Sequence, residues 1–297
     1  MSRILTLLRP KPANTPKAPK TKRPGRRRPA SSSGARAAKA TFVHCLHAEW
    51  IKIRTMRSTL YVVLGTLAFC LGLAALNGSS AGSDYASMTP ADRAAFDPLA
   101  TSLRGYLLAQ IALGLLGGLV ISCEYGARTI VSTLTSVPHR IRVLAAKAVV
   151  LVAVVLPVGI VVSLAGFLVG QGALAGAGAP HLSLGDGMAL RGVLGGGLYL
   201  ALAGLFGLAL GTMIRSTTAT VTTLFGVMLI VQAFAPALPG AVGDWVSTYW
   251  PPIAGGQIIT GYRDPALLGP WAGLGVMAGC VAVLMAAAFV VFRRRDA

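Results

Sequence analysis

The segment from Cys123 to Arg140, CEYGARTIVSTLTSVPHR, is polar and lies between two of the most apolar stretches of the chain. On a helical wheel its apolar side chains share one face, and Arg128 and the Ser and Thr residues occupy the rest. Pro138 ends this helix, because proline cannot continue the hydrogen-bond ladder. The apolar face consists of Ala127, Ile130, Val131, Leu134 and Val137. This pattern predicts a short amphipathic helix rather than a minimal turn.

A helix of this kind suits docking, since its apolar face can enter a groove on a partner protein while its polar rim fixes the register. Movement of that partner would then push on the two apolar stretches that flank the helix. The same pattern also fits an interfacial helix that rests on lipid headgroups, or a long loop.

The residue patterns of membrane metalloproteases and of ATP-binding loops are absent from the sequence. There is neither an H-E-x-x-H pair nor a G-x-x-x-x-G-K-[ST] loop to cradle phosphates. The four cysteines show no metal-ligand spacing, and none of the four histidines falls inside an apolar stretch. We therefore expect no enzyme activity and no cofactor bound by this chain. Any ATP that drives it is expected to bind another polypeptide.

The elements that position the polar segment belong to a membrane protein. Of the 297 residues, 54% are hydrophobic and only 12% are charged, against about 25% charged in a soluble domain. The net charge of +18 is concentrated near the N-terminus, where fifteen of the 27 Lys and Arg residues lie between Arg3 and Arg57. Residues 1–40 hold no aromatic residue for base stacking, so we expect a membrane surface rather than nucleic acid as the partner.

Six apolar stretches are each about the ~20 residues that a membrane-crossing helix needs. They are Leu60–Leu76, Tyr106–Cys123, Ala148–Gly170, Val193–Ile214, Thr217–Ala235 and Pro270–Phe292. These stretches hold no Asp, Glu or His, which argues against a proton- or ion-coupled carrier. Lys147, at the start of the third stretch, is expected to snorkel to the interface. Several G-x-x-x-G pairs are expected to serve packing within the chain.

The distribution of bases orients the helices. With both termini in the cytoplasm, 23 Lys and Arg residues lie on the cytoplasmic side and four on the outer side; without the fifteen between Arg3 and Arg57 the numbers are eight and four. The sequence therefore predicts a multi-pass protein of the cell membrane with cytoplasmic N- and C-termini. Residues 1–40, rich in Pro, Ser, Lys and Arg, are expected to be disordered.

A second amphipathic helix is predicted from Phe42 to Arg57. Phe42, Leu46, Trp50 and Ile53 recur at helical spacing and share one face. Such a helix can lie in the membrane interface with Trp50 toward the acyl chains. Near the C-terminus, PIAGGQII fits either a short helix in the outer leaflet or a surface loop.

Residues 41–297 resemble the permease subunit of a type-2 ATP-binding-cassette (ABC) exporter, in the form common in high-GC Gram-positive bacteria. The order and spacing of five segments carry the resemblance: HAEWIKIRTMRST, EYGARTIVSTLTSVPHRIRVLAAKA, RGVLGGGLYLALAGLFGLALGTMIRSTTAT, PPIAGGQII and FRRRDA. The resemblance implies an all-α fold of six transmembrane helices, with an N-terminal elbow helix and a cytoplasmic coupling helix.

The resemblance also assigns roles to residues. Glu49, Trp50, Lys52 and Arg54 fall in the elbow helix. Glu124, Ala127, Arg128, Ile130, Val131, Leu134, Val137 and Pro138 fall in the coupling helix, which inserts into a separate ATPase subunit. Glu124 is expected to be held by an elbow base such as Lys52 or Arg54, and the Arg215–Ser216 turn to be a second, minor contact. Two permease chains, identical or similar, would work with two ATPases.

In such exporters the second and fifth spans line the path, which makes Gln110, Thr218, Thr222 and Gln232 candidate path-lining residues. The apolar character of both spans favours a lipophilic solute such as a drug or lipid. Two other classes remain open: an ATP-independent channel or neutral-solute carrier, and a membrane binding or immunity protein without transport.

Overall fold

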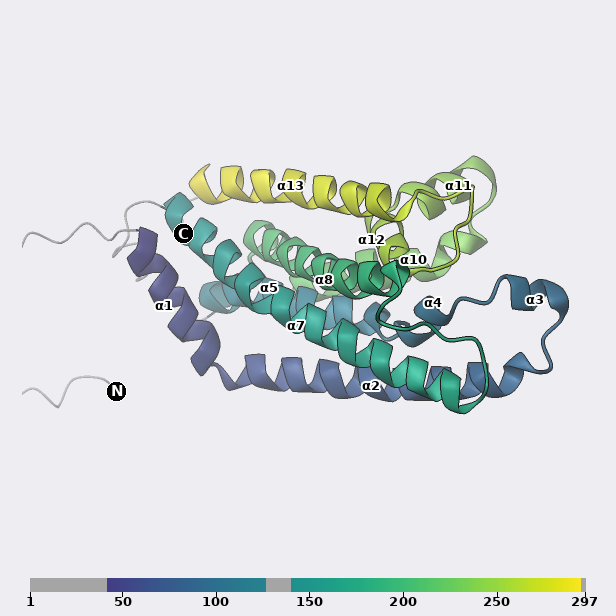
Figure 1. Cartoon of the computed structure of the whole chain (residues 1–297). Coiled ribbons are helices and arrows are strands. Elements are labelled where there is room, and N and C mark those ends of the chain that lie inside the picture. Colours follow the sequence, from purple (N-terminus) through teal and green to yellow (C-terminus); the bar gives the residue numbers. More distant parts are fainter. Residues whose placement is uncertain (1–41, 127–139, 295–297) are drawn as a thin grey trace, which may run out of the picture. The chain divides into compact units, whose positions relative to one another are not determined.

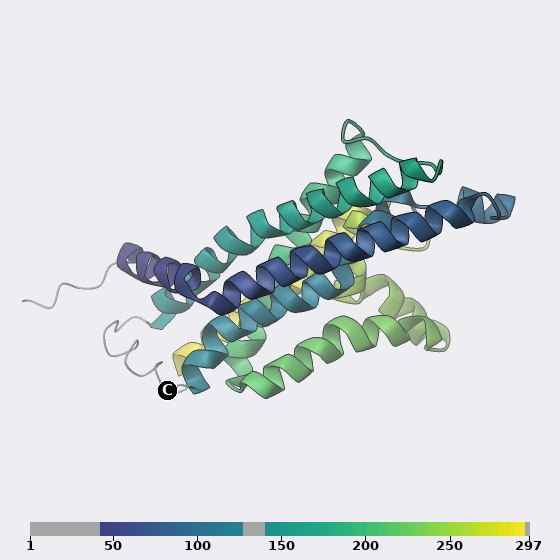
Figure 2. The same ribbon diagram turned by 90° about the horizontal axis from the view of Figure 1, so that it is seen from below.

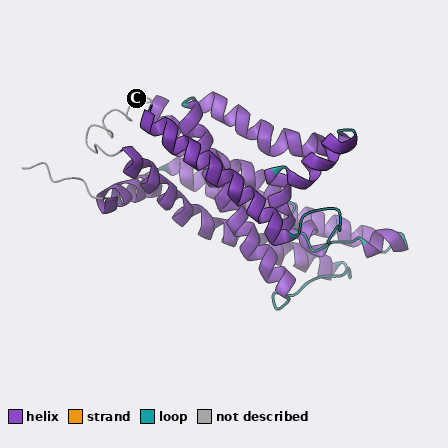
Figure 3. Cartoon of the chain, turned by 90° about the horizontal axis from the view of Figure 1, so that it is seen from above, coloured by secondary structure: helices purple, strands orange, loops and turns teal. Residues whose placement is uncertain are grey.

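The computed structural model describes residues 42–126 and 140–294, and every regular element in these ranges is helical (Figures 1 and 3). Six helices, or helical runs, in the described ranges are long and apolar enough to cross a membrane. They are α2 (Arg57–Tyr85), α5 (Tyr106–Gly126), α7 (Arg140–Gly176), α8 (Gly187–Ile214), the run from α9 (Thr217–Phe225) to α10 (Val231–Phe234), and α13 (Pro270–Arg294). The prediction of six helices long and apolar enough to cross a membrane is confirmed. The predicted basic tail and most of the predicted coupling helix lie outside the described residues.

The fourth span, α8, is the central helix of the bundle. Its apolar window is 72% buried, compared with 22% for α2 and for α13. The helices α5, α7 and α13 all pack on it, so α8 lies between α7 and α13 (Figure 1).

Glycines bring α5 and α8 into backbone contact. A Cβ added to Gly207 would overlap the carbonyl oxygen of Gly114, and one added to Gly117 would overlap that of Gly204. Gly211 likewise faces the carbonyl oxygen of Gly118. Small residues permit this approach because no side chain stands between the helices. The predicted intrachain use of the G-x-x-x-G pairs is confirmed here.

The fifth span is not a uniform α-helix. Between α9 and α10, the segment η1 (Gly226–Ile230) is a π-helix, in which Val231 N–H donates to the carbonyl oxygen of Gly226 five residues earlier. Such wide turns are rare and occur often at functional sites. The run continues into η2 (Ala235–Ala237) and lies along one flank of the bundle, where α9 packs on α5 (Figure 2).

Short helices cluster at one end of the bundle, called here the α12 end. They are α3 (Pro90–Ala94), α4 (Pro98–Ser102), α11 (Gly240–Tyr249), α12 (Pro251–Gly256) and η3 (Gln257–Ile259). The Asp97 carboxylate caps α4 and also accepts hydrogen bonds from the Gly261 and Tyr262 N–H groups, at 2.7 and 2.9 Å. Of the two expectations for PIAGGQII, the helix is correct, and its Ala254, Gly255 and Ile258 are buried.

The opposite end, called the α1 end, carries α1 (Phe42–Thr55), which is set at an angle to α2 (Figure 1). The chain turns at Met56, whose backbone is extended. Cys45, Glu49 and Ile53 form the buried face of α1, whereas Trp50 is 37% exposed. The helix itself was predicted, and its inward face includes an acid that the apolar pattern did not single out.

We expect Gly207→Leu to destabilise the bundle, because its side chain must push α5 away from α8. Overpacking of this kind costs about 1–3 kcal/mol or more, so the melting temperature of the detergent-purified protein should fall by roughly 5 °C. Gly72→Leu on α2 is the matched control, since a Cβ there meets nothing within 4 Å. Equal melting temperatures for the two variants would contradict the close α5–α8 contact.

Candidate functional site

A cluster of four charged side chains lies at the α1 end, where α1, α5 and α7 meet. The Lys147 Nζ on α7 is 2.8 Å from Glu49 Oε2 and 2.6 Å from Glu124 Oε1. It also lies 3.4 Å from the Val120 carbonyl oxygen. Lys52 on α1 forms an ion pair with the same Glu124 oxygen. The side chain of Lys147 is fully buried, Glu49 and Glu124 are nearly so, and Lys52 is 42% exposed.

The cluster balances its own charge, with two carboxylates and two ammonium groups. A single buried charge is costly, and it is tolerated when partners and hydrogen bonds replace water. The expectation that Lys147 snorkels to the interface is therefore wrong. Two carboxylates from neighbouring helices close over it, so that the ammonium group finds its partners inside the protein.

Glu124 connects the cluster to the segment that follows α5. The predicted pairing of Glu124 with an elbow base is present, and the base is Lys52. Arg54 instead lies over the Trp50 ring, with 5.9 Å between the guanidinium carbon and the ring centroid. The second carboxylate oxygen of Glu124 is buried and has no hydrogen-bond partner within the described residues.

The other side of the α5 end contacts the turn between α8 and α9. Arg215 stands over the Tyr125 ring at 5.0 Å and has a left-handed backbone, with φ of 60°. One turn before Tyr125 on α5, Ser122 Oγ accepts a hydrogen bond from the Thr217 hydroxyl at 3.3 Å. The last turn of α5 thus contacts four elements: α1, α7, and the ends of α8 and α9.

Most residues predicted to dock the ATPase lie outside the described residues. They are Ala127, Arg128, Ile130, Val131, Leu134, Val137 and Pro138. Their docking role remains a prediction. Sequence reasoning missed Glu49 as a partner of Lys147; the available signal was its position one turn from Cys45 and from Ile53 on the same face of α1.

A second polar group lies in the interior of the bundle, towards the α12 end. The Gln110 side-chain amide donates to the Met228 carbonyl oxygen and to Gln232 Oε1, both at 3.2 Å. The Tyr199 hydroxyl donates to Gln110 Oε1, and Gln232 donates to the Tyr106 hydroxyl at 3.4 Å. Gln110 and Tyr199 are fully buried. Met228 belongs to the π-helix, so this network ties the irregular turn of the fifth span to α5 and α8.

Two of the four candidate path-lining residues therefore meet, and two do not. Gln110 and Gln232 are hydrogen-bonded to each other. Thr218 and Thr222 lie on the exposed face of α9, where the Thr222 hydroxyl donates to the Thr218 carbonyl oxygen at 3.1 Å. Their role in a path remains a prediction.

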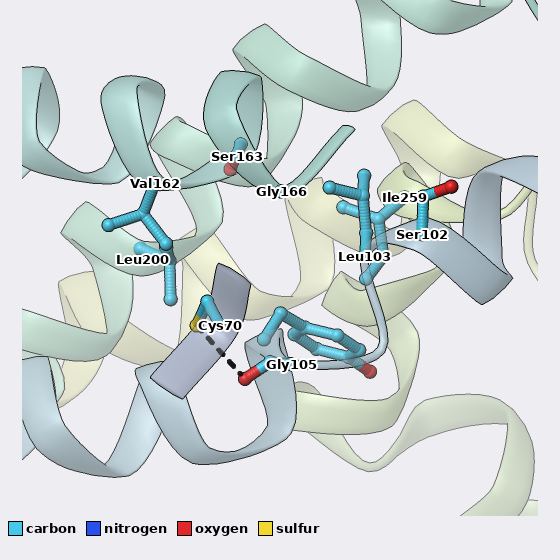
Figure 4. Close-up of a pocket in the computed structure, with 10 residues that line it drawn as sticks. Cys70, Ser102, Leu103, Gly105, Val162, Ser163, Gly166, Leu200 and Ile259 are labelled. Carbon is cyan, nitrogen blue, oxygen red and sulfur yellow. Dashed lines mark hydrogen bonds between the residues drawn. The ribbon is translucent and has the colours of Figure 1, made fainter. Parts of the chain in front are cut away.

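A small cavity lies between α2, α5 and α7 (Figure 4). Cys70, Ser102 and Ser163 are among the side chains that line it, and the Cys70 thiol is 3.5 Å from the Gly105 carbonyl oxygen. Its volume is about 20 Å³. Since a single water needs about 10–15 Å³ measured in this way, the cavity fits one water and no organic solute.

Residues 78–82, GSSAG, match the G-x-S-x-G spacing of a hydrolase nucleophile. Ser80, however, lies inside the uninterrupted helix α2 rather than on a strand-to-helix turn. No group of three His, Cys, Asp or Glu side chains suited to a metal occurs in residues 42–126 and 140–294.

The chain matches no model of a known protein family and no curated protein. The functional assignment therefore depends on its own residues and geometry.

We expect Lys147→Met to destabilise the α1 end strongly, because it leaves two carboxylates close together without the buried ammonium group. Removing one member of a buried ion pair costs about 3–5 kcal/mol, which lowers the melting temperature by roughly 10 °C. Arg142→Met on the exposed face of α7 is the control and should change little.

The double variant Lys147→Met/Glu49→Gln tests the charge balance directly. It retains the Lys52–Glu124 pair and removes one charge of each sign, so most of the lost stability should return. If the double variant melted no higher than Lys147→Met, charge pairing would not explain the cluster.

Proposed function

We propose that this chain is the permease subunit of an ABC exporter, driven by a separate ATPase. The observation that carries the proposal is the ion cluster at the end of α5. It fastens α1, α5 and α7 together at the point where the chain enters residues 127–139, whose sequence has the amphipathic pattern of a docking helix.

A force applied to that docking helix needs a rigid connection to the spans. Breaking the buried pairs of Lys147 costs several kcal/mol, so displacement of the α5 end moves α1 and α7 with it. The contacts of Arg215 and Thr217 extend the connection to α8 and α9. In this proposal α1 is the elbow helix, and closure of two ATP-bound ATPases drives the spans between inward and outward access.

The fifth span supports a role for a second permease chain. The run from α9 to α10 packs on α5 and α8 on one side, and only 22% of its apolar window is buried. Its open side carries Thr218 and Thr222 next to Phe225, which is 43% exposed. We propose that this side faces the partner chain and the translocation path, and that a lipophilic solute moves there.

The proposed orientation has both termini in the cytoplasm of a plasma-membrane protein. Lys147 is buried and paired, so it is left out of the count of orienting bases. Outside residues 3–57 this reduces the cytoplasmic number from eight to seven, against four on the outer side. The asymmetry still favours the α1 end as the cytoplasmic end.

Affinity purification of the full chain from its host in mild detergent tests the proposal. We expect an ATPase with a phosphate-binding loop to co-purify in equal amount. Ile130→Asp/Leu134→Asp places two charges on the apolar docking face and should reduce co-purification at least about tenfold, since burying unpaired charges is unfavourable.

Ser132→Asp/Ser136→Asp on the polar face is the matched control and should retain much more of the ATPase. Membrane insertion of both variants is checked by alkaline extraction. Unchanged association of the Ile130/Leu134 variant would contradict the docking role. A chain that purified alone would favour an ATP-independent channel or a binding protein.

A further inference from the structure

The central helix α8 leaves one face uncovered. Leu190, Leu194 and Leu198 are 52%, 42% and 39% exposed, although the helix is otherwise the most buried span. Half-buried Leu202 and Leu205 continue the same stripe. The residues recur at intervals of three or four, and from Leu190 to Leu205 they extend about 22 Å along the helix. This length exceeds half of the ~30 Å hydrocarbon core of a bilayer.

The part of this stripe from Leu198 to Leu205 forms the floor of a groove. The α7 side chains Val152 and Leu156 form one wall, and the α13 residues Leu274, Gly275 and Ala278 form the other. The groove has a volume of about 400 Å³. Every lining side chain that it takes from the three helices is apolar, apart from the indole N–H of Trp271.

The lining of the groove indicates what fills it. From Leu198 to Leu205 the groove runs for roughly 10 Å between α7 and α13, and its walls are apolar. A flexible hydrocarbon chain can follow such a short apolar groove between two helices. The three walls belong to membrane-spanning helices, so the medium that meets the groove is lipid.

Trp271 marks where the polar end of such a molecule lies. It is the second residue of α13, at the α12 end of the groove, and it is 61% exposed. Tryptophan favours the headgroup region, where its ring meets hydrocarbon and its N–H finds an acceptor.

We propose that this groove is a binding site for one acyl chain of a membrane phospholipid, with the glycerol and headgroup beside Trp271. The chain covers the leucine stripe of α8 and holds α7 and α13 at their separation. In the orientation proposed above, the lipid belongs to the outer leaflet. The site itself depends only on the three helices and not on transport or on an ATPase.

Two positions of α13 provide a pair of variants. A Cβ added to Gly275 meets nothing within 4 Å, so this position accepts a larger residue, and Gly275 lines the groove. Ala286, three turns further along α13, is exposed and does not line the groove. Gly275→Phe should fill the space of the acyl chain, and Ala286→Phe should not. Ala278→Leu is a second, smaller obstruction within the groove.

The experiment uses the full chain in vesicles of phosphatidylethanolamine and phosphatidylglycerol, with a trace of phosphatidylethanolamine that carries a diazirine in one chain. After illumination, labelled peptides are mapped by mass spectrometry. We expect the peptides of Leu198, Leu202 and Leu274 to be labelled more strongly than the lipid-facing peptide of Leu60 and Leu64. Gly275→Phe should reduce groove labelling about tenfold, from the loss of about two buried methylenes. Ala278→Leu should reduce it less, and Ala286→Phe should leave it unchanged.

Three results would overturn the proposal. The first is equal labelling of the groove and of the Leu60 and Leu64 peptide, which would mean ordinary surrounding lipid. The second is groove labelling that Gly275→Phe and Ala278→Leu leave intact while melting temperatures show that both fold. The third is an unlabelled groove in which Gly275→Cys forms a disulfide with a second copy of the chain, which would identify a protein occupant.

Discussion

The backbone contact between α5 and α8 is the constraint on which the rest of the structure depends. Glycines at Gly114, Gly117, Gly204 and Gly207 let the two backbones touch at the closest points of this seam. In a bilayer, apolar burial drives helices together only weakly, so close packing of this kind supplies much of the association energy. Because α8 is central, the position of α5 against it fixes both ends of α5: the ion cluster at Glu124 and the hydrogen bond between Gln110 and Tyr199.

The two polar groups of the bundle are held by different means. At the α1 end, full charges are paired with opposite charges, and the exposed Lys52 connects the cluster to water. In the interior only neutral amides, hydroxyls and backbone carbonyls are used, and a neutral network avoids the cost of burying ions. The α5 end is therefore held by paired ions, and the interior of the bundle by neutral hydrogen bonds.

Much of the fold follows from the sequence. Hydropathy located all six spans, because a bilayer requires long apolar helices. The site was less accessible. A helical wheel of α1 placed Phe42, Leu46 and Trp50 on the principal apolar face, and only the tertiary contact with Lys147 shows that Glu49 points inward. Lys147 itself lies at a span end, where exposure is the usual outcome. Which carboxylates close over it depends on helix packing, which local pattern does not contain.

The π-turn in the fifth span has a further consequence. In an ideal α-helix each residue adds about 100° of rotation, so Thr218 and Gln232 would lie about 40° apart, on one face. The wide turn at Gly226–Ile230 absorbs roughly one residue, which places them about 140° apart instead. That rotation lets the Gln232 amide face Gln110 while the Thr218 and Thr222 hydroxyls face outward. The faces of α9 and α10 are therefore rotated relative to each other about the axis of this span. Loss of a single residue from the turn would restore a regular α-helix and still leave the two positions about 140° apart, so the two faces would keep their relative orientation.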